Sequence, residues 1–304
     1  MDYQVERHVT ENGHETNRNS LTESRPRAGV PPTFLYIGGD RCGSKSQHNF
    51  FRQHPDCYVP PIADPYFFDR HYDRGLEWYF SLFEKAPKHV TAIGEFSHDY
   101  LHSPEAAERI ARDLPDVKLL VTLRHPIDRT FSSYVAAFSA GATTLPFEEA
   151  LQSDPMFIGN SLYADKLDVY FSHFPRDRIL VQLFDDLESD PEAFAKCAFH
   201  FVGLSEAPSI DYGARLAKLS SPRFPLAGVF SRQAANFLRR LGWVNLLGKL
   251  KNHPLVRPIF YRPFSDDNRP TMRDDTRDYL RQVFSPQIDR LETMLGCDLG
   301  HWRQ

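Results

Sequence analysis

Residues 33–46 read TFLYIGGDRCGSKS, a short apolar run followed by a turn rich in glycine and small polar residues. Residues 33–37 have the β-branched and aromatic bias of a buried strand, and residues 46–52 (SQHNFFR) predict a helix. A strand, a glycine turn and a helix N-terminus together present backbone N–H groups that bind an anion. The stretch therefore predicts a phosphate-binding loop, with an ordinary tight turn as the plainer alternative.

The side chains of this loop favour the phosphate-binding interpretation. Gly43 lets the backbone approach a ligand, Ser44 and Ser46 add hydroxyl donors, and Arg41 and Lys45 supply positive charge. The pattern differs from the P-loop of nucleotide kinases, G-x-x-x-x-G-K-[ST], because a serine stands between the second glycine and the lysine. We therefore expect a relative of the P-loop.

A second strand-to-helix turn follows residues 117–123 (VKLLVTL), which form another continuous apolar run. Arg124 ends that run and Ser132 lies in the next predicted helix, so both can face the crevice outside the carboxyl ends of a parallel sheet. The guanidinium suits a terminal phosphate because it donates two parallel hydrogen bonds. Arg124 alone is better explained by a surface salt bridge, but Pro126, Arg129, Ser132 and Tyr134 in the same segment favour a second phosphate site.

The two loops resemble those of sulfotransferases that use 3′-phosphoadenosine-5′-phosphosulfate (PAPS), most closely the heparan sulfate sulfotransferase branch. The first is similar to that family's 5′-phosphosulfate loop, K-x-G-T-[TR]-[AS], and the second to its 3′-phosphate motif, R-x-P-x-x-R-x-x-S-x-Y. The likeness extends from Pro31 to Trp302. Further family-like segments occur in the same order: 64–69 (DPYFFD) with 75–79 (GLEWY), 94–101 (GEFSHDYL), 161–163 (SLY) and 178–187 (RILVQLFDDL).

The resemblance implies a donor site and a catalytic pair. Glu95 is the expected general base for an acceptor hydroxyl, and Arg41 stands where the family has its catalytic lysine, as a charge that stabilises the leaving phosphate. Residues 220–225 (SSPRFP) stand where the family has a loop that closes over the nucleotide, which adds Arg223 and, more weakly, Lys218 as candidates. The donor-binding residues expected are Arg41, Cys42, Gly43, Ser44, Lys45, Ser46, Arg124, Ser132, Arg223 and Lys218.

The sequence departs from the family pattern on both sides of the expected site. Arg41 replaces the lysine, and Ser44-Lys45 replaces a Thr-Thr or Thr-Arg pair. Phe96 replaces a lysine and His98 a proline, so we expect the acceptor side to differ from that of the heparan enzymes. Asp64 and Asp69 are further candidates for acceptor contact, whereas the lone histidines His98 and His125 are assigned to local hydrogen bonds.

The reaction implied is transfer of a sulfuryl group from PAPS to a hydroxyl, or amine, of a saccharide or related small metabolite. The product nucleotide is 3′-phosphoadenosine-5′-phosphate (PAP), and no metal is required because sulfuryl carries less charge than phosphoryl. Two alternatives remain. A nucleotide kinase or NTPase of the P-loop class would need a metal-holding acid after a buried strand, for which only Asp185-Asp186 offers itself. A non-catalytic binder of phosphorylated or sulfated ligands would explain the change to Arg41.

Composition agrees with one large enzyme domain. The chain has 304 residues, 41% of them hydrophobic, and a net charge of −4, which gives no general case for a nucleic-acid partner. Its four cysteines lack C-x-x-C pairing, so we expect reduced thiols and a cytoplasmic location. No apolar run approaches the length of a membrane span. Residues 1–29 are polar and predict a disordered or loosely docked tail, leaving a sulfotransferase domain at 30–304.

Alternating strand and helix signals predict an α/β fold, a P-loop-like parallel sheet with helices on both faces. Strands are expected at 90–94, 117–123 and 178–183. Helices are expected after a cap at Ser103, from Pro126, and at 161–173, 191–201 and 274–295. The last helix is assigned to structure, with core positions at Tyr279, Val283, Ile288, Leu291 and Leu295, and residues 299–302 are expected to pack back.

The segment from 212 to 265 contains no acidic residue. A positively charged lobe would concentrate an anionic donor or acceptor near the cleft. A solvated helix face is the competing interpretation, as is an interfacial helix at 237–250 in peripheral contact with an anionic membrane. The basic residues of the segment are Arg215, Lys218, Arg223, Arg232, Arg239, Arg240, Lys249, Lys251, Arg257 and Arg262.

Overall fold

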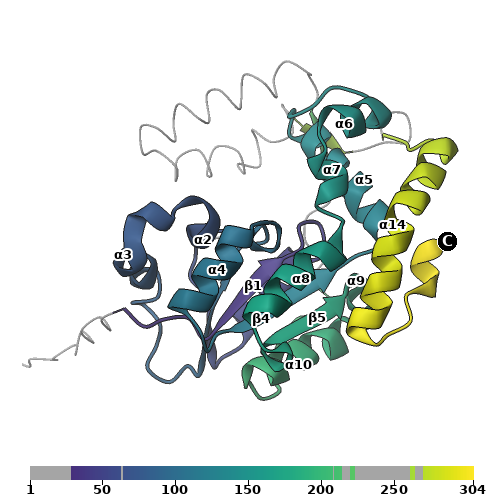
Figure 1. Cartoon of the computed structure of the whole chain (residues 1–304). Coiled ribbons are helices and arrows are strands. Elements are labelled where there is room, and N and C mark those ends of the chain that lie inside the picture. Colours follow the sequence, from purple (N-terminus) through teal and green to yellow (C-terminus); the bar gives the residue numbers. More distant parts are fainter. Residues whose placement is uncertain (1–28, 63, 208, 214–219, 223–260, 264–269) are drawn as a thin grey trace, which may run out of the picture.

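The computed structural model describes residues 29–62, 64–207, 209–213, 220–222, 261–263 and 270–304 (Figure 1). Its elements are β1 (Phe34–Gly38), α1 (Ser44–Gln53), β2 (Cys57–Tyr58), α2 (Phe67–Arg70), η1 (Tyr72–Arg74), α3 (Gly75–Ser81), β3 (Ala92–Phe96), η2 (Tyr100–His102), α4 (Pro104–Asp113), β4 (Lys118–Leu123), α5 (Pro126–Ser139), α6 (Phe147–Ser153), α7 (Met156–Gly159), α8 (Tyr163–His173), η3 (Arg176–Arg178), β5 (Ile179–Leu183), α9 (Phe184–Ser189), α10 (Pro191–Val202), β6 (Ser220–Pro222), β7 (Tyr261–Pro263), α14 (Asp274–Leu295) and η4 (Gly300–Arg303).

Five described strands form one parallel sheet in the order β2-β3-β1-β4-β5. From β1 the chain passes to the edge strand β2 and returns to β3, which pairs with β1, and it then crosses to β4 and β5 on the other side of β1. The direction of building therefore reverses beside β1, the kind of point at which open α/β sheets bind ligands. The predicted parallel sheet is confirmed, and the turns after β1, β3 and β4 meet at its carboxyl edge. The strands β6 and β7 pair separately and antiparallel.

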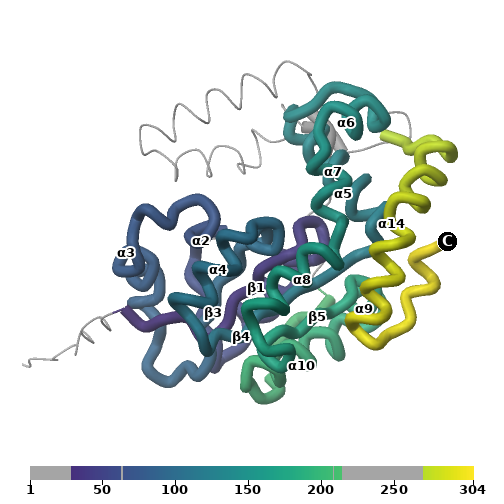
Figure 2. The backbone as a smooth tube through the Cα atoms, in the orientation of Figure 1, coloured from purple at the N-terminus to yellow at the C-terminus, as the bar shows by residue number. Residues whose placement is uncertain are grey.

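The two faces of the sheet bury two cores, because alternate residues of a strand point to opposite faces. On β1, Phe34 and Tyr36 pack with the aromatic residues of α1 and α10, whereas Leu35 and Ile37 pack with α4 and α8 on the other face. Figure 2 shows α8 and α10 beside the strands and α14, in yellow, at the far end. The helices thus cover both faces, as expected from the alternating signals.

Local signals placed most elements correctly. Ser103 caps α4 by accepting a hydrogen bond from the backbone N–H of Ala106 at 3.1 Å, and the segment before Trp302 packs back, so that this tryptophan is 1% exposed. The strand expected at 90–94 is shifted and runs over Ala92–Phe96. Within it, Gly94 pairs with Phe34, and an added Cβ at Gly94 would lie 2.0 Å from the ring.

The last helix has the expected bounds but a different buried stripe. Tyr279, assigned to the core, is 53% exposed, and that assignment is wrong. Val283 and Leu295 are only partly buried. Ile288 and Leu291 are buried as expected, together with Leu280 and Phe284. The sequence offers two adjacent apolar rows here, and the row containing Leu280 and Phe284 is the one that packs against α5 and α8.

Several expectations concern residues outside the described part of the chain. They include the tail up to residue 28, Lys218 and Arg223, and the helix considered at 237–250. No helix among the described residues combines the length and apolarity needed to cross a bilayer.

Candidate active site

The loop after β1 forms the first wall of the site. Gly43 (φ 90°) adopts the left-handed conformation as the N-cap of α1, and an added Cβ would lie 2.4 Å from Leu187 Cδ2. The first turn of α1 carries no acidic residue, so its free N–H groups and its dipole both favour an anion. The loop is tied to β4 by a hydrogen bond from Gly39 N to the carbonyl of Thr122 at 2.9 Å. Lys45 and Ser46 lie in that same first turn.

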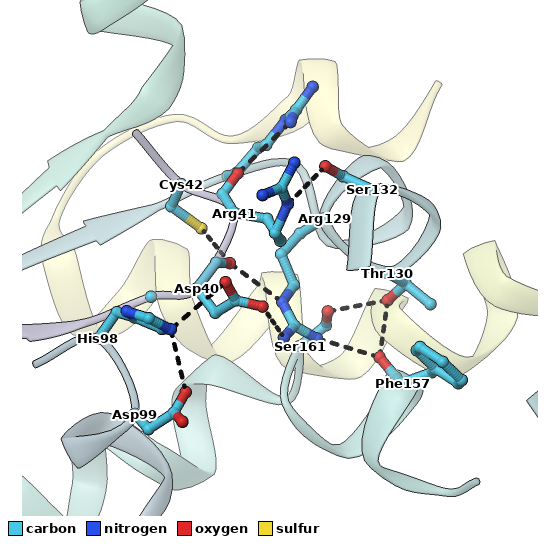
Figure 3. A network of polar contacts seen from close by, with 12 residues as sticks. Asp40, Arg41, Cys42, His98, Asp99, Arg129, Thr130, Ser132, Phe157 and Ser161 are labelled. Carbon is cyan, nitrogen blue, oxygen red and sulfur yellow. Dashed lines mark hydrogen bonds and ion pairs between the residues drawn. The ribbon is translucent and has the colours of Figure 1, made fainter. Parts of the chain in front are cut away.

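The loop after β4 meets the first loop directly. The Nε of Arg41 donates to Ser132 Oγ on α5 at 3.1 Å, and Arg124 Nη1 donates to the carbonyl of Arg41 at 3.4 Å. The Arg124 guanidinium also lies 4.5 Å above the ring of Phe184. Burial, outweighing the charge of Asp40, lowers the pKa of Arg41. Two guanidinium groups and a helix N-terminus therefore converge at the carboxyl edge of β1 and β4. Figure 3 shows the contact between Arg41 and Ser132.

Cys42 is the one residue of the expected donor loop whose side chain turns inward. It is fully buried, and its Sγ contacts the carbonyl of Asp40 at 3.4 Å and the hydroxyl of Tyr163 at 3.9 Å. Burial raises the pKa of the thiol to about 11, so the group is neutral at physiological pH. Only the backbone of Cys42 is left to face a ligand.

Arg129 is a buried cation behind the donor loop, 1% exposed. It donates to the Asp40 carbonyl at 3.3 Å and to the Phe157 carbonyl at 3.2 Å, and its Nη2 lies 3.5 Å from Asp40 Oδ2 (Figure 3). Thr130 and Ser161 complete the network through a hydroxyl contact at 2.8 Å. The arginine of the second motif thus clamps the first loop from inside. Tyr134, from the same motif, is also buried and donates to the Leu145 carbonyl.

Glu95, near the carboxyl end of β3, is 1% exposed. Tyr79 donates to its Oε2 at 2.5 Å, and Ser97 donates to its Oε1. Burial raises the pKa of Glu95 to about 7, while these hydroxyl hydrogen bonds act in the opposite direction. The carboxylate predicted to be a base is thus at the expected edge of the sheet, but it is enclosed, and each oxygen already accepts a hydrogen bond.

His98 lies at the centre of a polar cluster that the sequence did not predict. Its Nδ1 is 2.7 Å from Asp64 Oδ1, and its Nε2 is 3.0 Å from the Tyr66 hydroxyl. Nε2 is also 3.8 Å from an oxygen of Asp40 and 3.6 Å from one of Asp99 (Figure 3). Burial alone would lower the pKa of His98, but the hydrogen bond to Asp64 and the three carboxylate charges raise it overall.

The other residues singled out in the sequence make local contacts of different kinds. Asp64 joins the His98 cluster, whereas Asp69 lies on α2 and pairs with Arg70 at 3.3 Å. Burial lowers the pKa of His125. Asp185, considered as a metal-holding acid, accepts from His301 at 3.0 Å instead. Among the described residues, no group of three or more His, Cys, Asp and Glu side chains is arranged to hold a metal ion.

Comparison with known proteins gives concordant results. A family model described as "Sulfotransferase family" matches residues 77–208. Human heparan sulfate glucosamine 3-O-sulfotransferase 6 is 30% identical over 251 residues, which cover 77% of this chain and 70% of that protein. The mouse protein of the same name is 32% identical with the same coverage. A crystal structure of a sulfotransferase from Alicyclobacillus acidocaldarius superposes with a TM-score of 0.67 at 24% identity, covering 90% of this chain and 100% of that one, which is a likeness of fold.

Proposed function

The chain belongs to the sulfotransferase family, and we propose that it transfers a sulfuryl group from PAPS to a hydroxyl, or amine, of a saccharide or related small metabolite. The relatives named above act on heparan sulfate, which supports a saccharide acceptor. Family membership does not favour the kinase or NTPase alternative. The observation that carries the proposal is the meeting of two anion-binding loops at one edge of the sheet, where Arg41 Nε lies 3.1 Å from Ser132 Oγ.

In this proposal the donor nucleotide bridges the two loops. The N–H groups at the start of α1, with Ser44, Lys45 and Ser46, hold the 5′-phosphosulfate. Arg124 and Ser132 hold the 3′-phosphate, for which the forked guanidinium provides two parallel donors. Lys218 and Arg223 stay further candidates from the sequence.

The chemistry asked of the protein is positioning and charge stabilisation, as in phosphoryl transfer. The acceptor oxygen forms a bond to sulfur while the bond from sulfur to the 5′-phosphate oxygen breaks, and the electron pair of that bond stays on PAP. Arg41, beside the start of α1, stabilises the charge that develops on the leaving oxygen. Glu95 is the general base predicted from the sequence, and a pKa of about 7 suits that role near neutral pH. Because the residue is 1% exposed and each oxygen already accepts one hydrogen bond, an acceptor hydroxyl has to reach a remaining lone pair inside the fold.

The test is a direct assay of donor turnover. Labelled PAPS is incubated with a panel of saccharides and hydroxylated metabolites, and formation of PAP and of sulfated product is measured. PAP should raise the melting temperature of the wild-type protein, and should raise it less in Arg124→Ala. Arg178→Ala is the matched control, because Arg178 pairs with Asp116 at the amino ends of β5 and β4, opposite to the edge that carries the two loops. The proposal is wrong if no acceptor yields PAP and PAP leaves the melting temperature unchanged.

Cellular location and domain boundary are separate matters. The cytoplasmic location expected from the unpaired cysteines stays a prediction, as does the start of the domain at residue 30. A fractionation experiment on cells that express the full chain would test the first, and limited proteolysis the second.

A further inference from the structure

Arg124 and Arg129 come from the same motif, but the protein holds them in different ways. Each of the three side-chain nitrogens of Arg129 donates to the protein. Among the described residues, the Arg124 side chain makes one hydrogen bond, from Nη1 to the Arg41 carbonyl at 3.4 Å. It also lies against the ring of Phe184, whose centroid is 4.5 Å from the guanidinium carbon. Within this part of the chain, Arg124 therefore keeps most of its five N–H donors for a ligand.

An aromatic ring suits an arginine that has to bind a phosphate. The π face of the ring attracts the cation, and this attraction uses none of the N–H groups of the guanidinium. A carboxylate partner would instead occupy two of these donors and offset the positive charge. The pair of Arg124 and Phe184 therefore fixes a cation without reducing its capacity to bind an anion.

Phe184 also packs against the other loop of the site. It is the first residue of α9, and an added Cβ at Gly43 would lie 3.2 Å from its Cδ2 and 2.4 Å from Leu187 Cδ2. The helix α9 is therefore seated directly on the N-cap of α1. One aromatic ring thus spans the first loop and the arginine of the second.

The end of the chain holds α9 in this place. Asp185, next to Phe184, lies 3.0 Å from His301 Nε2 and accepts a hydrogen bond from Trp302 Nε1 at 3.3 Å. Trp302 is 1% exposed, and the centroid of its ring lies 6.3 Å from that of His125, the residue after the arginine. Figure 1 shows α9 beside the C-terminal segment. The buried tryptophan therefore lies beside the chain neighbours of both members of the arginine–phenylalanine pair.

We propose that Phe184 is a positioning residue of the donor site, which holds Arg124 for the 3′-phosphate and is itself held by the hydrogen bond from Trp302 to Asp185. The inference rests on the proposed binding of PAPS and deepens it. It makes α9 and the chain end responsible for part of the preference for a nucleotide that carries a 3′-phosphate. Binding of the 5′-phosphate at the start of α1 depends on Phe184 only through the apolar bulk beside Gly43.

The first experiment measures the affinities for PAP and for 5′-AMP, which lacks the 3′-phosphate, by calorimetric titration. Phe184→Leu keeps apolar bulk beside Gly43 but removes the π face, so PAP affinity should fall about fivefold while 5′-AMP affinity stays within about twofold. Phe184→Tyr keeps the π face and should bind PAP as wild type does. Phe171→Leu is the matched control, because the Phe171 ring lies 4.1 Å from the Arg176 guanidinium at the amino end of β5. An equal loss of affinity for both nucleotides in Phe184→Leu would overturn the proposal, because general loosening of the site weakens both.

The second experiment is a double-mutant cycle of Arg124→Ala and Phe184→Leu, with PAP alone as the probe. If Phe184 acts through Arg124, the double variant should bind PAP no more weakly than Arg124→Ala does. In the enzyme assay, Phe184→Leu should raise KM for PAPS and leave kcat nearly unchanged. Losses of PAP affinity that multiply in the double variant would overturn the proposal, because Phe184 would then act independently of Arg124.

The third experiment addresses the bond to the chain end. Asp185→Asn keeps an oxygen that can accept from Trp302 Nε1 and should bind PAP as wild type does. Asp185→Ala removes that oxygen and should weaken PAP binding about threefold, with 5′-AMP affinity unchanged. Asp278→Ala, which breaks an ion pair with Arg281 on α14, is the control. Wild-type PAP affinity in Asp185→Ala would overturn the part of the proposal that concerns Trp302.

The outcomes separate this inference from the proposed function. If wild type binds no PAP and forms none from PAPS, the proposed function is wrong and this inference is wrong with it. If wild type binds PAP and Phe184→Leu binds it equally well, only the role of Phe184 is wrong. Melting temperatures without ligand show whether each variant is folded, and Phe184→Ile takes the place of Phe184→Leu, with the same expected losses, if the leucine variant does not fold.

Discussion

Asp40 lies between two charged side chains, Arg129 and His98, whose surroundings differ. On one side Arg129 is 1% exposed and is bound by two backbone carbonyls and the Asp40 carboxylate. On the other side His98 is 23% exposed and faces three carboxylates at up to 3.8 Å. The first side is a dry clamp that fixes the shape of the donor loop, and the second is an open cluster whose protonation can change. Asp40 belongs to both.

The contrast shows that a motif residue can serve the site without touching a ligand. Arg129 occupies a conspicuous motif position, yet each of its three side-chain nitrogens donates to the protein itself. His98 replaces a proline in the family-like segment 94–101, and its Nε2 faces Asp40 and the Tyr66 hydroxyl in a partly exposed cluster. We therefore expect substitutions of the buried clamp to lower stability more than substitutions of the partly exposed cluster.

The largest effect is expected at the clamp. Arg129→Met removes a buried cation and leaves the Phe157 carbonyl and Asp40 without it, so the free energy of unfolding should fall by about 3 kcal/mol. Urea denaturation measures this loss of stability. The control is Arg178→Met, which removes an arginine whose side chain is 35% exposed, and it should lower the free energy of unfolding by less than about 1 kcal/mol. Equal stability of the two variants would remove the distinction between a clamp and an open cluster.

A comparable effect, dependent on pH, is expected for Glu95. Its pKa rises from 4.5 unfolded to about 7 folded, so its ionisation opposes folding. The opposition is absent below pH 4.5, grows as pH rises, and is complete above pH 7, where it amounts to about 3 kcal/mol. Glu95→Gln lacks this ionisation. As pH rises from 4.5 to 8, the free energy of unfolding of the variant should therefore increase relative to that of wild type by about 3 kcal/mol.

Urea denaturation at four pH values checks this gain. Glu84→Gln, on the surface after α3, is the control. A difference between Glu95→Gln and wild type that does not change with pH would mean that Glu95 is less enclosed than the hydrogen bonds of Tyr79 and Ser97 indicate.

A smaller effect is expected in the donor loop itself. Gly43→Ala places a Cβ at φ 90° and 2.4 Å from Leu187 Cδ2, which should lower the free energy of unfolding by about 2 kcal/mol and weaken PAP binding. Gly159→Ala is a matched control, because an added Cβ there meets nothing within 4 Å. Calorimetric titration with PAP would distinguish the two, and wild-type affinity in Gly43→Ala would show that α1 does not bind the phosphate.

The smallest effect is expected where the two loops touch. Ser132→Ala removes the hydroxyl that accepts from Arg41 Nε at 3.1 Å and that we propose binds the 3′-phosphate. Loss of one hydrogen bond to the ligand costs about 1 kcal/mol, which is a roughly fivefold loss of PAP affinity. Ser133→Ala, at the next position of α5, is the control. If both serine variants bind PAP equally well, the Arg41–Ser132 contact does not define the donor site.

Local features of the site were predictable because each depends on neighbouring residues. The strand, the glycine turn and the first turn of α1 follow from residues 33–53, and the Ser103 cap follows from residues 103–106. The His98 cluster was not predictable in the same way. Its carboxylates come from positions 40, 64 and 99, and the contact between them depends on strand order and on the left-handed turn at Asp64.

Burial was the other quantity that the sequence left open. Glu95 was placed at the correct edge of the sheet, but its enclosure depends on Tyr79 from α3, which only the packing of α3 against β3 determines. Tyr279 was assigned to the wrong row of α14 because residues 279–284 offer apolar side chains on two adjacent faces. A helix with two such rows has its orientation chosen by the partner surface, here α5 and α8.

The ring of Phe34 on β1 packs over Gly94 on β3, so the lack of a side chain at Gly94 sets how closely the two strands approach. Phe51 and Phe96 pack on that ring with centroids at 4.7 and 6.2 Å, so a methyl group at position 94 would act as a wedge between neighbouring strands. β1 leads into the loop that we propose binds the nucleotide, and β3 carries Glu95, the general base predicted from the sequence. Group transfer tolerates little misplacement of the reacting groups. The missing side chain at Gly94 therefore matters to the site, although Gly94 is not expected to touch a substrate.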